Sequence, residues 1–295
     1  MLKIGVLMGG KSSEHEISVI SGEQVCKALG NRGYEVTPIK LSKDGKNWDE
    51  INKLRKVDIC FIAIHGKNGE DGTIQGMLEI MGVKYTGCRV LASALGMDKL
   101  MFRKFLDSLS IKHPKEVGLK PKKFPVFVKP NCGGSSVGVT KVKKVKELKS
   151  ALKLAFKYDK AVLVEEAIEG REFTCGVIGN LEKQEVLPVV EIVPEHEFFD
   201  YESKYESQKT QEVVPAKISK KISDKLQEIS RKIFVEIGAK GFFRVDFMMD
   251  KNNQPFVLEI NTIPGLTPMS LMPKAAKAAG YSYEDFIEKV VWYSL

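Results

Sequence analysis

The sequence predicts an α/β protein that opens with a parallel sheet and continues into a region of hairpins. Two observations predict this class. The first third alternates short apolar strands with longer amphipathic helices, which is typical of a parallel sheet with helices on its faces. Farther along, apolar strands are separated only by short turns or by a glycine-rich loop. The length of 295 residues fits three regions of about a hundred residues each better than one core.

The N-terminal elements are predicted from their apolar spacing. Lys3–Met8 is expected to be a buried strand, and Glu14–Leu29 has the spacing of an amphipathic helix. Further strands are expected at Glu35–Leu41 and Val57–Ile64. Ligands of parallel sheets bind at the carboxyl ends of strands. The polar segment that begins at His65 is therefore a candidate for function.

The later elements follow from the same patterns. A helical stretch around 95–109 is expected to close the first region, and a Lys/Pro-rich connector covers 114–125. Residues 194–215 show no clear periodicity. The other expected elements are strands at 126–130, 139–142, 161–165, 172–179, 185–193, 242–249 and 256–261, and helices at 145–158, 219–237 and from about 283.

Composition narrows the class of protein. Forty-six Lys and Arg against 38 Asp and Glu leave a formal charge of +8, which favours an anionic partner but leaves nucleic acid, phosphate ligands and simple solubility open. No apolar run approaches the roughly 18 residues of a membrane span. The N-terminus is too short and too quickly polar for a signal peptide. Five widely spaced cysteines favour reduced thiols in a cytoplasm over disulfides or zinc.

The most basic stretch, Lys141–Lys160, carries eight lysines. Nucleic-acid interfaces usually combine such charges with arginines or exposed aromatic side chains. These lysines lie on an expected helix without interleaved arginines, so a solvated helix face is the favoured interpretation. No nucleic-acid partner is expected.

A literal P-loop pattern, G-x-x-x-x-G-K-[ST], covers Gly5–Ser12. A P-loop needs a flexible loop between its glycines so that backbone N–H groups can surround the phosphates. Here the residues between the glycines continue a buried strand, so a P-loop is not expected. Glu14, at the start of the next helix, could hold an ammonium group. Taken alone, a helix-capping acid favoured by the helix dipole is the better interpretation.

The segment 131–138, NCGGSSVG, lies between two expected strands. Its three glycines allow close backbone approach, and its serines and N–H groups suit phosphate oxygens. Lys129 at the end of the preceding strand adds a positive charge. A simple hairpin turn is the alternative, but eight residues exceed what a turn needs. Phosphate binding under a hairpin lid is therefore favoured.

The last two expected strands, 242–249 and 256–261, form a predicted hairpin. Alternate side chains of a strand share a face, so a turn centred on 252–253 places Asp246 opposite Glu259 and Arg244 opposite Asn261. Two carboxylates and an amide are the hard oxygen ligands that Mg²⁺ prefers when it also binds phosphates. An Arg–Asp–Glu salt-bridge ladder is the alternative. The metal is favoured because buried polar groups on otherwise apolar strands need partners.

These features, in this order, resemble the ATP-grasp ligases, and among them the D-alanine–D-alanine ligase family. The resemblance runs from Gly5 to about Ile287, and it implies an ATP-grasp fold preceded by an N-terminal Rossmann-like domain. The implied divisions are a substrate-binding domain at 1–95, a lid domain at 96–178 and a metal- and substrate-binding domain at 179–295. The most specific segments are GGKSSEHEIS, HGKNGEDGTIQGMLE, MDK, VKPNCGGSSVGV, EFT, DYESKY, FRVDFM and LEINTIPGLTPMSL.

The resemblance implies a binding site for ATP and for two Mg²⁺ or Mn²⁺ ions. The residues that resemble the family's ATP-binding positions are Lys99, Lys129, Ser135, Ser136, Glu165, Ala167, Ile168, Glu172 and Lys204. Those that resemble its metal ligands are Asp246, Glu259 and Asn261.

The resemblance also implies sites for two D-alanines. At the site of the first D-alanine, Glu14 would hold the substrate's ammonium and His65 would lie near the substrate. Ser135 and Tyr205 would hydrogen-bond to Glu14. Arg244 and the backbone of Gly265 resemble the groups that stabilise the tetrahedral intermediate. Ser270 and Leu271 resemble the site for the carboxylate of the second D-alanine. Cys132-Gly133 and Met269 depart from what many relatives carry, in the lid and near the second subsite.

The implied activity is ATP-dependent ligation of two D-alanines through D-alanyl phosphate, for peptidoglycan precursor synthesis by a cytoplasmic homodimer without a membrane partner. D-Alanine–D-lactate ligation is the nearest alternative, and Tyr205 argues against it. A non-catalytic nucleotide-binding regulator is disfavoured because Asp246, Glu259 and the other reacting positions are intact.

Overall fold

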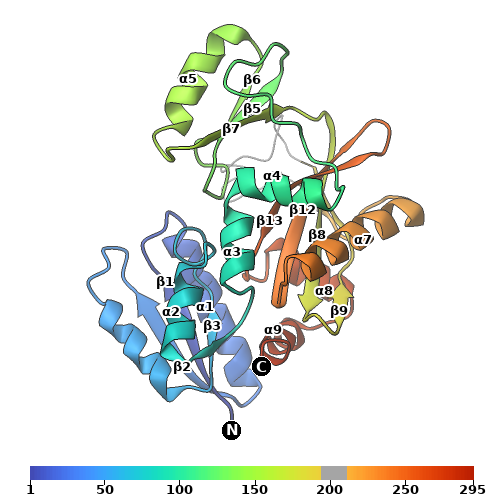
Figure 1. The fold of residues 1–295 in the computed structure, drawn as a ribbon. Coiled ribbons are helices and arrows are strands. Elements are labelled where there is room, and N and C mark those ends of the chain that lie inside the picture. The colour runs from blue at the N-terminus through green and yellow to red at the C-terminus, as the bar shows by residue number, and fades with distance from the viewer. Residues whose placement is uncertain (194–210) are drawn as a thin grey trace.

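The structure, a computed structural model, describes residues 1–193 and 211–295. Figure 1 shows three sheets, with the N-terminal sheet at the bottom, a small sheet at the top and the largest sheet between them. None of the helices in the described ranges is both long and apolar enough to cross a membrane.

The N-terminal sheet has the order β2-β1-β3-β4 and is parallel throughout, as the strand–helix alternation predicts. Its central strands β1 and β3 are buried because their residues are apolar on both faces, and Ile4 and Leu7 have no exposed surface. The elements are β1 (Lys3–Gly9), α1 (His15–Asn31), β2 (Glu35–Leu41), η1 (Trp48–Lys56), β3 (Ile59–Ile62), α2 (Thr73–Met81) and β4 (Lys84–Tyr85).

The largest sheet is antiparallel, with the order β11-β10-β8-β12-β13 and β9 paired to β8. Its strands are β8 (Gly170–Gly179), β9 (Gln184–Val186), β10 (Val190–Val193), β11 (Gln211–Val213), β12 (Gly241–Asp250) and β13 (Pro255–Asn261). The helices around it are α3 (Val90–Met97), α4 (Lys99–Ser108), α7 (Lys220–Glu236), α8 (Leu271–Ala278) and α9 (Tyr283–Trp292).

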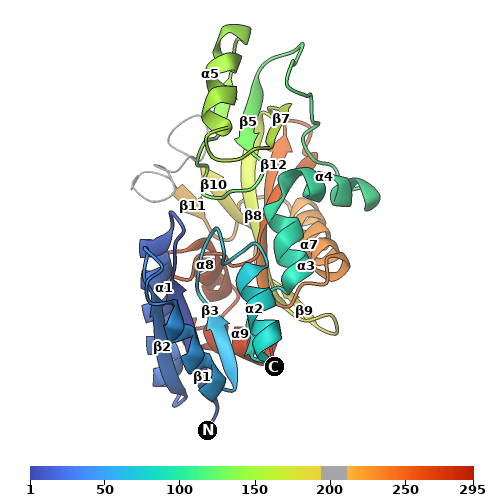
Figure 2. The ribbon, with the colours of Figure 1, turned by 60° about the vertical axis from the view of Figure 1, so that its left-hand side comes forward.

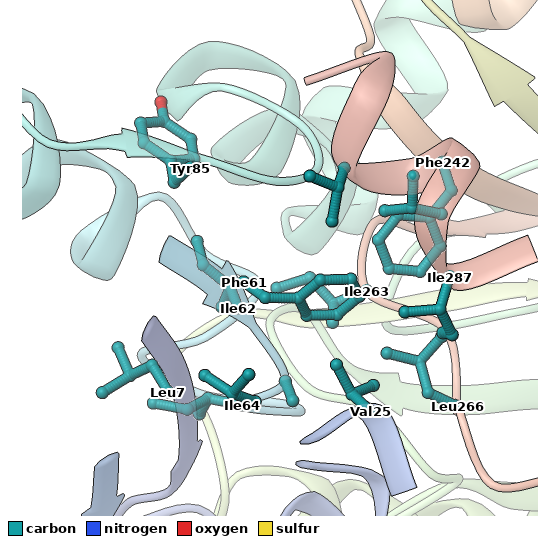
Figure 3. Close-up of a cluster of buried hydrophobic side chains, with 14 of the residues drawn as sticks. Leu7, Val25, Phe61, Ile62, Ile64, Tyr85, Phe242, Ile263, Leu266 and Ile287 are labelled. Atoms are coloured by element: carbon teal, nitrogen blue, oxygen red, sulfur yellow. The ribbon is translucent and has the colours of Figure 1, made fainter. Parts of the chain in front are cut away.

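Two hydrophobic cores cover opposite sides of this sheet. Side chains of α3, α4 and α7 pack with β8, β12 and β13 in one core. The other core joins the N-terminal sheet to α8 and α9, which lie beside that sheet in Figure 2. Phe61 of β3, Phe242 of β12 and Ile287 of α9 meet there, together with Ile263 and Leu266 (Figure 3). This shared core fixes the strand ends of the N-terminal sheet relative to those of the largest sheet.

The small sheet has the order β6-β5-β7 and carries α5 on one face (Figure 1). Its elements are β5 (Val126–Pro130), β6 (Thr140–Val142), α5 (Val145–Ala155) and β7 (Val162–Glu166). It has a separate core, in which Val126, Val128 and Val164 pack against Ala151 and Ala155. The antiparallel pairing of β5 with β6 confirms the predicted hairpin around residues 131–138.

Several expected elements differ from those in the structure. The expected helix at 95–109 is two helices, because Asp98 lies between α3 and α4 and its side chain accepts a hydrogen bond from the N–H of Met101. The expected strand at 185–193 is also divided, into β9 and β10. α2 and α8 were not expected, since each has fewer than ten residues. Part of the aperiodic segment 194–215 is the strand β11.

The three domain ranges stay predictions. The boundary between 178 and 179 falls at the end of β8, which pairs with β12 along its whole length. All five cysteines are free thiols.

Candidate active site

Two adjoining cavities lie where the three sheets converge. The lid cavity lies between the small sheet and the largest sheet, and the inner cavity lies between the N-terminal sheet and β13. Both are lined by Lys99, Gly133, Gly134, Arg244 and Glu259. A ligand in one cavity can therefore meet a ligand in the other at this shared wall, which carries three charged side chains.

The lid cavity has an apolar part and a charged part. Phe127, Ile168 and Leu258 are among the apolar lining residues, whereas Lys129 and Glu172 bring charge. A cleft with apolar walls and a few polar groups suits a planar ring attached to a polar chain. Expected nucleotide residues that line it are Lys99, Lys129, Ser136, Glu165, Ile168 and Glu172. Ala167 is not in this lining, and its N–H bonds to the carbonyl of Pro125.

Lys99 is the first residue of α4 and is 7% exposed. Its Nζ donates to the carbonyl of Gly133 at 2.6 Å and lies 3.6 Å from Oε2 of Glu259. Burial lowers the pKa of Lys99, and the carboxylate of Glu259 opposes that effect. A buried ammonium whose positive charge is only partly balanced by a nearby carboxylate attracts an anion such as phosphate.

The loop 131–138 is anchored at its start to α4. The side-chain Oδ1 of Asn131 accepts from the N–H of Leu100 at 2.8 Å. Ser135 and Ser136 have positive φ angles of 51° and 58°, which gives this loop a compact left-handed bend. The next helix, α5, begins only at Val145, so the loop 131–138 is not a P-loop. The literal P-loop match is likewise excluded by structure, because β1 runs through to Gly9.

The predicted hairpin register is confirmed. Asp246 pairs with Glu259 and Arg244 with Asn261, and a bulge after Asp246 separates these pairs from the rest of the ladder. The guanidinium of Arg244 binds both oxygens of Asp246, at 2.8 Å each, within β12. Glu259 lies 3.6 Å from Nζ of Lys99. The Arg–Asp part of the alternative salt-bridge ladder is therefore present, as an ion pair within β12.

The same residues pass a test for metal binding. The Oδ1 atom of Asn261 is buried and has no hydrogen-bond partner among the described residues. A buried carbonyl oxygen without a partner is costly unless a ligand satisfies it. Asp246 also accepts from Thr174 at 2.6 Å, yet a carboxylate has about four lone-pair positions and so retains capacity. These oxygens fit a hard divalent cation.

The inner cavity contains Glu14, which is the residue before α1 and is 8% exposed. Its side chain does not cap the helix, so the capping interpretation of Glu14 is wrong. Instead its Oε1 accepts a hydrogen bond from the hydroxyl of Ser135, in the lid loop. This contact brings together two residues that sequence analysis expected to act as a pair.

His65 is 2% exposed and has both ring nitrogens hydrogen-bonded. Nδ1 lies 2.8 Å from the carbonyl of Ile263, and Nε2 lies 2.9 Å from the hydroxyl of Ser21. Burial lowers the pKa of His65, whereas nearby Glu14 acts in the opposite direction. The ring is therefore neutral, with its proton on Nδ1 because a carbonyl can only accept.

Glu70 belongs to the polar segment that begins at His65, which the sequence makes a candidate for function, but no role was predicted for this residue. It lines the inner cavity, is 9% exposed and accepts from the N–H of Gly66 at 2.7 Å. Burial raises its pKa to about 8, and the nearby charge of Glu14 adds to this shift. The spacing of Glu70 four residues after Gly66 was the available signal.

The far end of the inner cavity is the N-terminus of α8. Ser270 precedes this helix and hydrogen-bonds to Thr267 at 2.8 Å, and Leu271 is its first residue. Gly265 lies against them, since a Cβ there would be 2.8 Å from the Ser270 hydroxyl. Free N–H groups at a helix N-terminus suit a carboxylate. Met269 also lines this end.

Two expected site residues, Lys204 and Tyr205, lie outside the described residues. The others that line the inner cavity are Glu14, His65, Ser135, Arg244, Glu259, Asn261, Gly265, Ser270 and Leu271. A small lid sheet over a larger antiparallel sheet, with cationic and carboxylate side chains at their junction, defines the ATP-grasp class of ligases.

Comparisons with known proteins identify the family within this class. The family model described as D-ala D-ala ligase N-terminus matches residues 3–52 and 46–88, and that described as D-ala D-ala ligase C-terminus matches residues 91–292. The D-alanine–D-alanine ligase of Carboxydothermus hydrogenoformans is 42% identical over 100% of this chain and 98% of its own length. That of Pelotomaculum thermopropionicum is 40% identical over 98% and 96%. The chain belongs to the D-alanine–D-alanine ligase family.

Solved structures agree. The VanG D-Ala:D-Ser ligase of Enterococcus faecalis has a TM-score of 0.88 and 32% identity, covering 100% of this chain and 99% of its own. The Bacillus anthracis D-alanine–D-alanine ligase complexed with ATP has a TM-score of 0.83 and 33% identity, covering 100% and 97%. The predicted α/β ATP-grasp fold with its N-terminal parallel sheet is confirmed.

Proposed function

We propose that this protein joins two D-alanines to D-alanyl-D-alanine, with cleavage of ATP to ADP and phosphate, for the peptidoglycan precursor. The observation that carries the proposal is the shared wall of the two cavities. Lys99, Arg244 and Glu259 lie between a cavity suited to a nucleotide and one that contains Glu14. The phosphate end of ATP would thereby meet the carboxylate of an amino acid held by its ammonium.

ATP occupies the lid cavity in this proposal. Its phosphates lie at Lys99, Lys129 and the hydroxyls of the lid loop. Its adenine and ribose lie along β7 and β8, with Glu165, Ile168 and Glu172 lining that end and Ala167 contributing backbone. Lys204, outside the described residues, is a further proposed ATP-binding residue. A lid of this kind excludes water from a hydrolysable acylphosphate.

The first D-alanine lies in the inner cavity. Glu14 binds its ammonium, and the Ser135 hydroxyl fixes the orientation of that carboxylate, as Tyr205 also would. Neutral His65 lies beside the substrate without adding charge. The substrate carboxylate attacks the γ-phosphorus of ATP, the bond to the β–γ bridging oxygen breaks, and D-alanyl phosphate and ADP form.

The second D-alanine binds with its carboxylate at the N-terminus of α8, near Ser270 and Leu271. Its amine attacks the carbonyl carbon of D-alanyl phosphate, and the developing oxyanion is stabilised by Arg244 and the N–H of Gly265. The carbon–oxygen bond to phosphate then breaks, the amine loses a proton, and the dipeptide and phosphate leave.

Asp246, Glu259 and Asn261 would hold the two Mg²⁺ or Mn²⁺ ions. When bound, these ions reduce the repulsion between the γ-phosphate and the attacking carboxylate. The ion pair of Asp246 with Arg244 orients both side chains before substrates arrive. The homodimer and the cytoplasmic location are also proposals, and they rest on the family.

The test compares ADP formation and products with D-alanine alone, with L-alanine alone, and with D-alanine together with D-serine or D-lactate. Dependence on D-alanine with a dipeptide product supports the proposal. D-Serine is included because VanG is a D-Ala:D-Ser ligase. A chain that binds ATP but releases no ADP with any of them would instead be a regulator, and a depsipeptide as main product would favour the D-lactate alternative.

A further inference from the structure

Glu165 of β7 is buried between two cations. It is 1% exposed, and each of its oxygens is occupied. Nζ of Lys129 binds Oε1 at 2.6 Å, whereas Nε and Nη2 of Arg103 bind Oε2 at 3.2 and 2.8 Å. Lys129 and Glu165 line the lid cavity, but Arg103 does not. Arg103 therefore approaches the carboxylate from behind the cavity wall.

The charges of this cluster determine what Lys129 can offer to a nucleotide. Lys129 and Glu165 alone are a neutral pair, and a neutral pair attracts phosphate weakly. With Arg103, which is 3% exposed, the three side chains carry one net positive charge. Lys129 is the cation of this cluster that lines the cavity. The surplus charge is thus exposed to the ligand at that side chain.

Arg103 also removes a cost of ligand binding. If Lys129 turns toward a phosphate, it weakens its bond to Glu165, and an unpaired buried carboxylate is strongly unfavourable. Arg103 keeps that carboxylate paired. Its Nη1 is buried without a hydrogen-bond partner among the described residues, so one further donor remains close to Glu165. The Glu165 pKa is raised by burial but more strongly lowered by Lys129 and Arg103, which keeps the carboxyl ionised.

We propose that Arg103 is a positioning residue for nucleotide binding, which neutralises Glu165 so that Lys129 presents an uncompensated positive charge to the phosphates. Arg103 follows Lys99 by four residues on α4, so one helix face supplies a direct phosphate contact and the support for another. The inference rests on the proposed ATP site and adds a residue that touches no substrate.

The test measures binding of MgADP to the purified protein by calorimetry, without D-alanine. Arg103→Met removes the charge and keeps the length of the side chain. We expect the MgADP dissociation constant to rise about tenfold or more, since a buried charge loses its partner. In steady-state assays KM for ATP should rise similarly, with kcat and KM for D-alanine nearly unchanged. Arg103→Lys should recover most of the affinity.

A second variant distinguishes the loss of the Arg103 charge from a structural effect of the Arg103 substitution. In Arg103→Met/Glu165→Gln no carboxylate remains to neutralise Lys129, so MgADP should bind more tightly than to Arg103→Met, even though a second side chain, in the cavity lining, is altered. Arg171→Met is the matched control. Arg171 makes a similar paired contact with Glu191, at 2.7 and 2.8 Å, and neither residue lines either cavity.

An unchanged dissociation constant in Arg103→Met would overturn the inference. So would a double variant that binds no better than Arg103→Met, or an equal loss in Arg171→Met, since each indicates a merely structural role. If Arg103→Met does not fold, Arg103→Gln, which also removes the charge, replaces it both alone and together with Glu165→Gln. Wild-type protein that binds MgADP but makes no dipeptide would refute the proposed function alone.

Discussion

The hydroxyl of Ser135 donates a hydrogen bond to Oε1 of Glu14, although 121 residues separate them. Ser135 belongs to the loop between β5 and β6 of the small sheet, and Glu14 precedes the first helix of the N-terminal sheet. The contact closes the inner cavity on the side of the lid. The proposed substrate ammonium would then bind the second carboxylate oxygen of Glu14.

Ser135→Ala tests this contact. A hydrogen bond to a charged group contributes about 1.5–3 kcal/mol, so KM for the first D-alanine should rise roughly 10- to 100-fold. KM for ATP should change less. Ser150→Ala is the control, because Ser150 is exposed on α5 and bonds only to the carbonyl of Glu147. Equal kinetics for Ser135→Ala and wild type would mean that the contact does not orient Glu14.

Glu259→Gln tests the proposed metal site. The amide lacks the charge that a divalent cation requires, so D-alanine-dependent ADP release should be abolished while circular dichroism stays that of the wild type. Binding of Mn²⁺ in the presence of ADP, followed by electron paramagnetic resonance, should weaken in parallel. Asp224→Asn, an exposed carboxylate on α7, serves as control. Near-normal turnover in Glu259→Gln would refute the metal assignment.

Tyr205→Phe tests a residue outside the described part of the chain. The resemblance places tyrosine at this position in dipeptide-forming members, so the variant should accept D-lactate better relative to D-alanine. The readout is the ratio of kcat/KM for the two second substrates. An unchanged ratio would show that Tyr205 does not distinguish them.

Glu70 should make stability depend on pH. Its pKa is raised from 4.5 to about 8 by burial and by the charge of Glu14. Between these values the folded protein binds a proton that the unfolded chain has lost, so stability falls as pH rises and the whole cost is present above about 8. Glu70→Gln removes this titration, and its advantage in free energy of unfolding should grow from pH 5 to pH 9 by a few kcal/mol, on the order expected from the shift.

The measurement is thermal unfolding of both proteins across that range without substrates. A constant difference in melting temperature between Glu70→Gln and wild type would mean that Glu70 is ionised in the folded protein at all these values of pH.

Phe242→Ala should destabilise the junction between the sheets. Its ring has no exposed surface and lies 6.4 Å, between centroids, from the rings of both Phe61 and Phe286. Removing a buried phenyl ring costs about 3–5 kcal/mol. Urea unfolding should show this loss, whereas Phe156→Ala on the exposed end of α5 should change stability little. If Phe242→Ala loses as little stability as Phe156→Ala, the core relaxes around the missing ring.

Much of the local structure follows from the sequence alone. The strand at Glu35–Leu41 has the predicted bounds, and the hairpin register of Asp246 with Glu259 is also as expected. Both depend on interactions between residues close in sequence, since periodicity sets which faces are buried and a short turn sets the register. The short helices α2 and α8 were missed because one or two turns give too little periodicity.

The tertiary structure decided contacts that no local pattern contains. Spacing could not show that Glu14 meets Ser135 instead of capping α1, because the two residues approach only when different sheets dock. The same is true of Glu70 and Arg103, whose importance arises from burial beside other charges. The sequence by itself therefore determined which residue types could bind phosphate, metal and ammonium. Packing across the three sheets decided which of these residues line the shared wall of the two cavities, and how burial and neighbouring charges set their charge states.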